Sequence, residues 1–270
     1  MPTLRTRDGV ELYYEVHGNG EPLVLLGGIM MSAASWAQHV PVLSRHARLI
    51  LLDMRDQGRS GRMRGEYPLD VHVPDVLALL DELKVERTHL MGVSYGGQVA
   101  QRVALTHPER LRTLILANVN HYITNLLAEI GQAWEVAAKL NDGERFFQLA
   151  VPFIYSRAFY ADHLEALHQR QAMFKRTLTQ EWFEGFVRLC HSAMGFRMTA
   201  DDLRRLEMPT LLLGADEDQL TPLRVMEEMY EAIPHCEFVN LPGTGHGACL
   251  ERPDDFMTVV IGFLAKHRQA

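Results

Sequence analysis

The stretch of residues 89–100 limits the possible folds of this chain more than any other part of the sequence. It runs from an apolar strand end through a Gly-x-Ser-x-Gly pentapeptide at 92–96 into a helical pattern. A serine on a strand-to-helix turn is held in a strained backbone conformation, with its hydroxyl clear of the sheet. Gly92 and Gly96 lack a Cβ atom, so we expect the strand and the helix to pass close to this turn. The free N–H groups at the helix N-terminus would then face whatever lies over Ser94.

Apolar runs alternate with helical patterns over most of the chain. A hairpin signal at Asp8-Gly9 joins two strands within residues 3–17. Further strands are expected at residues 22–26, 47–52, 111–117, 209–214 and 236–241, and in the run that ends before Ser94. Helices are expected at residues 33–44, 70–83, 98–105, 222–232 and 253–266. Strands that alternate with helices imply right-handed crossovers and a parallel sheet. We therefore predict an α/β fold with a mostly parallel, eight-stranded sheet flanked by helices.

The strand pattern stops between residues 119 and 205. This segment is rich in helix formers, so we expect it to form a helical cap inserted into a core domain of residues 1–118 and 206–270. Parallel sheets carry their sites at the carboxyl ends of the strands, and a cap over that edge needs an apolar lining. We expect most of its aromatic side chains to form the cap's own core and a few to line a pocket. They are Trp134, Phe146, Phe147, Phe153, Tyr155, Phe159, Tyr160, Phe174, Trp182, Phe183 and Phe186.

The composition argues against several classes of protein. The 270 residues include 27 Lys+Arg against 34 Asp+Glu, a net charge of −7 that argues against a nucleic-acid partner. Arg55, Arg59, Arg62 and Arg64 form a local basic stretch, which we expect to be a solvated loop, with steering of an acidic substrate as the alternative. No apolar run approaches the ~20 residues that a membrane span requires.

The cysteines and the N-terminus indicate the compartment. The 3 cysteines have no Cys-x-x-Cys spacing, so neither a disulfide framework nor a zinc site is implied. The first residues lack the apolar segment of a signal peptide. We expect a cytoplasmic protein that needs no metal and no cofactor, and either a monomer or a homodimer fits.

Three residues, in chain order Ser94, Asp218 and His246, form a candidate catalytic set. A serine hydroxyl needs a base to take its proton, and histidine suits this role near neutral pH. His246 is singled out by its Gly-Thr-Gly-His-Gly turn directly after a predicted strand. A carboxylate must hold the histidine in the right tautomer. Asp218 is preferred because it lies in the loop before a predicted helix, and Asp216 and Glu217 remain alternatives.

An oxyanion formed during acyl transfer needs preorganised N–H donors. The N–H of Tyr95, directly after the serine, is one candidate. The second is expected in the loop after the strand at 22–26, at the N–H of Ile29. The alternative for this loop is a plain glycine-rich turn.

With these residues in place, the chain resembles the α/β-hydrolase superfamily across nearly its whole length. The resemblance is carried by Asp53-Met54-Arg55-Asp56-Gln57-Gly58-Arg59-Ser60, Gly92-Val93-Ser94-Tyr95-Gly96-Gly97, His107-Pro108-Glu109-Arg110, Asp218 with Pro222, and Gly245-His246. The chain order of nucleophile, acid and histidine is also that of the superfamily. The resemblance implies the α/β-hydrolase fold and a Ser-Asp-His triad.

The chain departs from the usual pattern at three places. The superfamily commonly has His-Gly where this chain has Gly27-Gly28, and glycine where Asp56 stands. The loop after Gly214 is one residue longer than the common spacing, which keeps Asp216 and Glu217 open as the acid.

The resemblance and the nucleophile type narrow the chemistry. Haloalkane dehalogenases and epoxide hydrolases of this fold use aspartate where Ser94 stands, so both are disfavoured. We expect a serine hydrolase that acts on a small or medium carboxylic ester, lactone or thioester. The alternatives are a carbon–carbon bond hydrolase, a non-catalytic ligand receptor, and an acyltransferase or thioesterase for 3-hydroxyacyl thioesters. The last alternative rests on a partial likeness of residues 27–36, 234–236 and 243–246 to bacterial 3-hydroxyacyl transferases.

Overall fold

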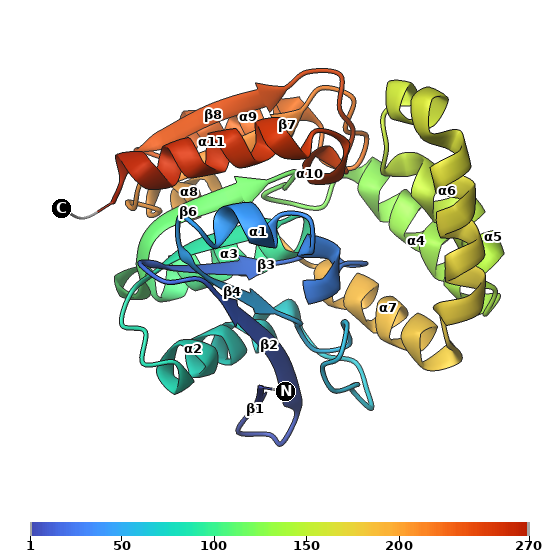
Figure 1. Cartoon of the computed structure of the whole chain (residues 1–270), viewed down its shortest axis with the longest axis horizontal. Coiled ribbons are helices and arrows are strands. Elements are labelled where there is room, and N and C mark those ends of the chain that lie inside the picture. The colour runs from blue at the N-terminus through green and yellow to red at the C-terminus, as the bar shows by residue number, and fades with distance from the viewer. Residues whose placement is uncertain (1, 269–270) are drawn as a thin grey trace.

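A sheet of eight strands, in the order β1-β2-β4-β3-β5-β6-β7-β8, forms the centre of the structure (Figure 1). The structure is a computed structural model that describes residues 2–268. The strands are β1 (Thr3–Arg5), β2 (Glu11–His17), β3 (Pro22–Leu26), β4 (Arg48–Leu52), β5 (Thr88–Val93), β6 (Leu111–Ala117), β7 (Thr210–Ala215) and β8 (Cys236–Leu241). Among these strands, β2 runs antiparallel to its neighbours β1 and β4, and the other neighbouring pairs are parallel. The predicted mostly parallel α/β sheet is confirmed.

Helices cover both faces of this sheet. They are α1 (Val40–Leu43), α2 (His72–Glu82), α3 (Tyr95–Thr106), α4 (Asn125–Lys139), α5 (Gly143–Ala150), α6 (Arg157–Thr177), α7 (Gln180–Ala193), α8 (Ala200–Arg204), α9 (Leu223–Ala232), α10 (Ala248–Glu251) and α11 (Pro253–Lys266). Alternate strand residues point to opposite faces, so Val24 and Leu26 pack with α2, α3 and α9, while Leu23 and Leu25 pack with α1 and α11. Both faces of the central strands are therefore buried, which explains their continuous apolar sequences.

The strand register brings the carboxyl ends of four strands to one edge. Leu26 of β3 pairs with Gly92 of β5, and Val93 pairs with Ala117 of β6. Ala117 in turn pairs with Leu213 of β7. The residues that follow these strands therefore leave the sheet side by side.

Between β6 and β7 the chain forms the helices α4 to α7, which we call the helical insertion. In Figure 1 it lies at the right, beyond the carboxyl end of β3. The side chains of Thr124, Asp142, Ser156 and Thr179 each accept a backbone N–H in the first turn of one of these helices. Its aromatic residues, with Phe146 and Phe186 fully buried among them, form a third apolar cluster separate from those on the two sheet faces.

A bidentate ion pair ties the helical insertion to the sheet domain. Arg188 of α7 donates through Nε to Oδ2 of Asp56 at 3.0 Å and through Nη2 to Oδ1 at 2.7 Å. Asp56 is buried and has a φ of 62°, a backbone region that favours glycine. The aspartate that stands where the superfamily has glycine thus occupies a strained position and holds a cation from the insertion.

Two local expectations were wrong. The single helix expected at 33–44 is a 3-10 turn at Ala33–Trp36 followed by the short α1. Pro41 explains the break, because it has no N–H and its ring clashes with the preceding turn of a helix.

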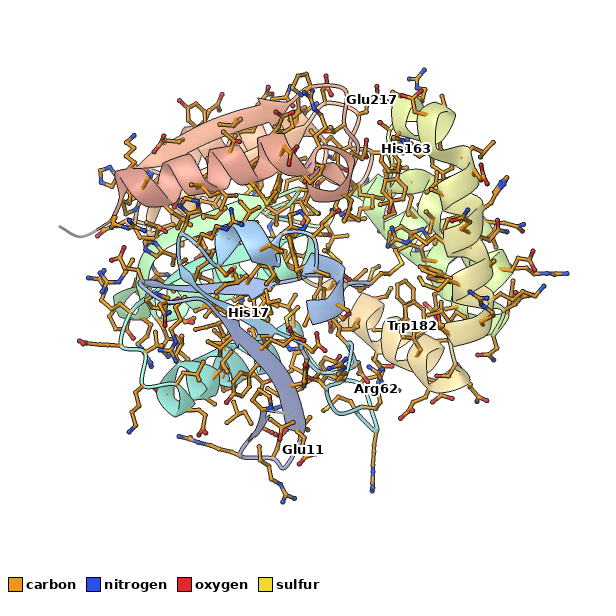
Figure 2. All side chains as sticks on the ribbon, in the orientation of Figure 1. Glu11, His17, Arg62, His163, Trp182 and Glu217 are labelled. Carbon is orange, nitrogen blue, oxygen red and sulfur yellow. The ribbon has the colours of Figure 1, made fainter. Side chains whose placement is uncertain are left out.

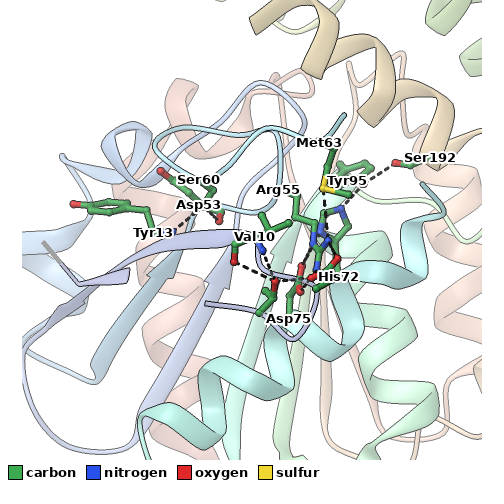
Figure 3. A network of polar contacts seen from close by, with 12 residues as sticks. Val10, Tyr13, Asp53, Arg55, Ser60, Met63, His72, Asp75, Tyr95 and Ser192 are labelled. Carbon is green, nitrogen blue, oxygen red and sulfur yellow. Dashed lines mark hydrogen bonds and ion pairs between the residues drawn. The ribbon is translucent and has the colours of Figure 1, made fainter. Parts of the chain in front are cut away.

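The second error concerns Arg55, which was expected in a solvated loop. Its side chain is 2% exposed. It donates to both carboxylate oxygens of Asp75, at 2.6 and 2.8 Å (Figure 3). It also donates to Asp8 Oδ1 at 2.9 Å. Arg55 holds the pKa of Asp8 down at about 2. A buried guanidinium needs such partners to offset its desolvation, and here they come from distant parts of the sequence.

Within residues 2–268, no helix combines the length and the apolar character that a membrane crossing would require.

Candidate active site

Ser94 stands alone between β5 and α3 in a conformation that side chains rarely adopt. Its φ is 52° and its ψ is −118°. A Cβ atom added to Gly92 would lie 2.3 Å from the carbonyl oxygen of Gly96, and one added to Gly96 would lie 2.4 Å from that of Leu26. The close approach expected from the pentapeptide is therefore present. Such a backbone costs about 1–3 kcal/mol and persists only where its surroundings enforce it.

His246 brings the candidate residues from distant parts of the chain into contact. Its Nε2 lies 2.8 Å from Ser94 Oγ, and its Nδ1 lies 2.8 Å from Asp218 Oδ2. Because an ionised carboxylate can only accept, Nδ1 carries the hydrogen and donates it to Asp218. In the neutral ring Nε2 is then unprotonated and accepts from the serine hydroxyl.

The carboxylate of Asp218 is fully buried and richly hydrogen-bonded. Its Oδ1 accepts the N–H groups of Leu220 and Thr221 at 2.8 and 2.9 Å. Its Oδ2 accepts from the hydroxyl of Thr221 at 2.5 Å and from Asn118 Nδ2 at 2.9 Å, in addition to His246. Burial acts to raise the pKa of Asp218, but His246 and the Thr221 donors outweigh it and leave the pKa below its ordinary value. The arrangement therefore keeps this carboxylate ionised.

The two acidic neighbours that the sequence left open bind elsewhere. Asp216 Oδ1 accepts the N–H of Gly243 at 2.6 Å. Glu217 Oε2 accepts the N–H of Arg157 at the start of α6, at 3.1 Å, and Figure 2 shows Glu217 beside that end of the helix. Of the three acids in this loop, the structure brings Asp218 to the histidine.

The two candidate oxyanion donors lie at the same cavity as Ser94. The N–H groups of Ile29 and Tyr95 donate to no acceptor within the described residues. Gly28 O accepts from Gln57 Nε2 at 2.8 Å and from the N–H of Met31 at 2.9 Å, and these bonds fix the loop that carries Ile29. Both donors are thus free to bind a ligand oxygen.

The phenol of Tyr95 links this turn to the helical insertion (Figure 3). Ser192 of α7 donates to Leu189 O at 2.8 Å, so its Oγ is left to accept from Tyr95 Oη at 2.7 Å. The phenol oxygen in turn accepts from His72 Nε2 at 2.8 Å. His72 is completely buried, and this desolvation lowers its pKa to about 3, so the ring is neutral.

A cavity of about 140 Å³ lies above Ser94, between the strand ends and the helical insertion. Its walls are mainly apolar, and they include Trp134, Tyr155 and Phe174 from the insertion, as expected for a few of its aromatics. The other residues lining it include Ile29, Met30, Gln98, Asn120, Leu127, Val151, Arg170, Cys190, Leu220, His246 and Leu250. Within residues 2–268, no three His, Cys, Asp or Glu side chains are grouped so as to hold a metal ion.

Asn118, Thr221 and Gln57 were not predicted as site residues. Thr221 carried a local signal, because a hydroxyl three residues after an aspartate often bonds to it. Asn118 follows a buried strand at the site edge and has a φ of 45°. Gln57 had no signal of its own beyond the motif around it, because its partner Gly28 lies 29 residues away.

Comparisons with known proteins agree with this architecture. Residues 21–253 match the sequence profile of the α/β hydrolase fold family. A putative carbamate hydrolase, RutD, from Azorhizobium caulinodans is 27% identical over 264 residues, which cover 94% of each chain. The crystal structure of MGS-M2, an α/β hydrolase from a Medee basin deep-sea metagenome library, superimposes with a TM-score of 0.93 at 30% identity, covering 97% of this chain and 96% of that one.

A second solved structure shares the fold alone. The enol-lactonase from Burkholderia xenovorans LB400 superimposes with a TM-score of 0.87 at 24% identity, covering 98% of this chain and all of that one. Together with the named relatives, the family match supports a hydrolase. The chain belongs to the α/β hydrolase fold family.

Proposed function

We propose that this protein is a serine hydrolase that cleaves a small or medium carboxylic ester, lactone or thioester through an acyl-enzyme. The observation that carries the proposal is the chain of 2.8 Å contacts from Asp218 through His246 to Ser94 at the floor of an apolar cavity. A serine in a strained turn with a base and an oriented carboxylate has the parts that nucleophilic catalysis requires.

The proposed reaction starts with attack of Ser94 Oγ on the substrate carbonyl. His246 Nε2 takes the hydroxyl proton, and Asp218 stabilises the imidazolium through Nδ1. The N–H groups of Ile29 and Tyr95 hold the oxyanion. His246 then returns the proton to the leaving group, and water, activated by the same histidine, releases the acid from Ser94.

Residues 119–205 are proposed to act as a cap on a core of residues 1–118 and 206–270. Support comes from the walls of the cavity, since Trp134 and Phe174 of the insertion lie opposite the sheet edge that carries Ser94. An apolar cavity of about 150 Å³ holds a benzene-sized group, so the cavity volume supports a short or medium acyl chain. The name of the relative at 27% identity, a putative carbamate hydrolase, is compatible with this class of carbonyl substrate.

A fluorophosphonate probe and p-nitrophenyl esters test the proposal. We expect the probe to modify Ser94, identified by peptide mapping, and p-nitrophenyl acetate or butyrate to give a burst followed by turnover. Ser94→Ala should abolish labelling, burst and turnover while its thermal unfolding stays cooperative. Equal burst and turnover in this variant and the wild type would refute the proposal.

A further inference from the structure

Two uncharged amide side chains meet at the wall of the cavity. Gln98 lies in the first turn of α3, and Asn120 lies just beyond β6. Gln98 Nε2 donates to Asn120 Oδ1 at 2.9 Å. Gln98 is 5% exposed, Asn120 is fully buried, and both line the cavity above Ser94.

This bond leaves half of each amide unused. Within residues 2–268, neither Gln98 Oε1 nor Asn120 Nδ2 has a hydrogen-bond partner, although both atoms are buried. Buried polar atoms are nearly always paired, so each such atom calls for an explanation. If both amides were turned over, their nitrogens and oxygens would exchange places, and the pair would still present one free acceptor and one free NH₂ group.

The pair is held rigidly relative to the nucleophile. The N–H of Gln98 donates to Ser94 O at 3.1 Å, which places it one helical turn from the serine. Gln101 Nε2 donates to the main-chain oxygen of Asn120 at 2.9 Å and fixes it from behind. The free donor and the free acceptor thus lie at a set position beside the reaction centre.

We infer that Gln98 and Asn120 form a specificity subsite for an uncharged group that both donates and accepts hydrogen bonds, a hydroxyl or a carboxamide. The substrate carries this group a few bonds from its reacting carbonyl. The inference rests on the proposed serine hydrolase function. The amide pair itself selects an uncharged group, because neither amide offsets the cost of burying a charge.

Pairs of esters that match in shape but differ in polarity test the subsite. On the acyl side, methyl 3-hydroxybutanoate is compared with methyl 3-methylbutanoate, and methyl succinamate with methyl 4-methylpentanoate. On the alcohol side, 2-hydroxyethyl butanoate is compared with propyl butanoate. Acid release in a pH-stat gives kcat/KM for each. For at least one pair we expect the wild type to favour the polar ester by about 10- to 100-fold, since an apolar group leaves buried amide atoms unpaired.

Variants of similar shape assign this preference to the pair. Gln98→Met and Asn120→Leu remove the free amide atoms, and we expect each to bring the polar-to-apolar ratio of kcat/KM close to one. Leu127→Met is the control, because Leu127 of α4 lines the same cavity and lies outside the amide pair. This control should keep the wild-type ratio.

The outcomes separate the two proposals. If fluorophosphonate labels Ser94 and the esters are hydrolysed, but every wild-type ratio lies near one, the subsite is refuted while the serine hydrolase stands. The same holds if the variants lower both members of a pair equally, as a structural role would. If a variant fails to fold, the wild-type ratios alone decide. If Ser94 is not labelled and no ester is cleaved, the hydrolase proposal fails and the subsite with it.

Discussion

Replacement of Asp218 by asparagine would test the hydrogen-bond geometry of the site at constant side-chain volume. The two backbone N–H groups that bind Oδ1, from Leu220 and Thr221, lie at 2.8 and 2.9 Å and cannot turn away. The amide oxygen of the asparagine must therefore take the Oδ1 position. Its NH₂ group then takes the Oδ2 position and faces His246 Nδ1.

This orientation would reverse the tautomer of the histidine. The NH₂ group donates to Nδ1, so the neutral imidazole carries its hydrogen on Nε2. Nε2 can then no longer accept the proton of Ser94, whose Oγ lies 2.8 Å away. In a triad of this kind the wrong tautomer lowers kcat by about 10⁴, which corresponds to about 5.5 kcal/mol of lost transition-state stabilisation.

Stopped-flow kinetics with p-nitrophenyl acetate measures this loss, and thermal unfolding shows whether the variant is folded. Asp216→Asn is the matched control. It removes a carboxylate from the same loop, but this carboxylate binds the N–H of Gly243 and not the histidine. We expect the control to keep the wild-type kcat. A folded Asp218→Asn variant with kcat within about tenfold of the wild type, a loss of no more than about 1.4 kcal/mol, would show that the reasoning is wrong.

Three further changes test the packing and the charges of the fold. Gly96→Ala puts a Cβ 2.4 Å from Leu26 O, and we expect urea denaturation to show a loss of about 1–3 kcal/mol or more; a neutral effect would contradict the close approach of α3 to β3. Arg55→Leu leaves the buried Asp75 without its cation and should lower the free energy of unfolding by about 3–5 kcal/mol, whereas a loss below about 1 kcal/mol would be evidence against the buried pair. The pKa of Asp8 is lowered from 3.8 to about 2 by Arg55, so its stabilising effect is complete above about pH 4 and is lost as the pH falls towards 2. Asp8→Asn should therefore be less stable than the wild type at neutral pH and equal to it near pH 2, and a difference that does not change with pH would rule out this linkage.

The sheet could be predicted because its signals are local. The run at β6 is mainly apolar despite Arg112 and Thr113, and its predicted bounds agree with Leu111–Ala117 in the structure. Residues 33–44 show where a local pattern misleads, since one proline divided an otherwise helical sequence. Arg55 shows the other limit, because its partners Asp8 and Asp75 lie 47 and 20 residues away. No pattern around an arginine reveals a carboxylate that only folding brings near.

The candidate site also contains residues with local sequence signals and residues that only the folded structure reveals. Ser94 and His246 could be proposed from their own glycine-rich turns. The choice of Asp218 over Asp216 and Glu217 depended on where a loop ends, and three-dimensional contacts are needed to see that Glu217 binds α6 instead. The Gln98–Asn120 pair gave no signal at all, because a glutamine in a helix and an asparagine after a strand are each commonplace until they meet.

The two attachments of α7 limit how a substrate can reach the cavity. Arg188 binds Asp56 and Ser192 binds Tyr95, and these helix residues lie four apart, on one face of α7. Movement of α7 away from the sheet would leave the carboxylate of Asp56 without its cation. It would also release Tyr95, whose N–H is proposed to bind the oxyanion. A passage that opens at α7 would thus disable the chemistry it admits. We expect any substrate entrance to form by movement of α4, α5 and α6, while α7 stays fixed to the sheet.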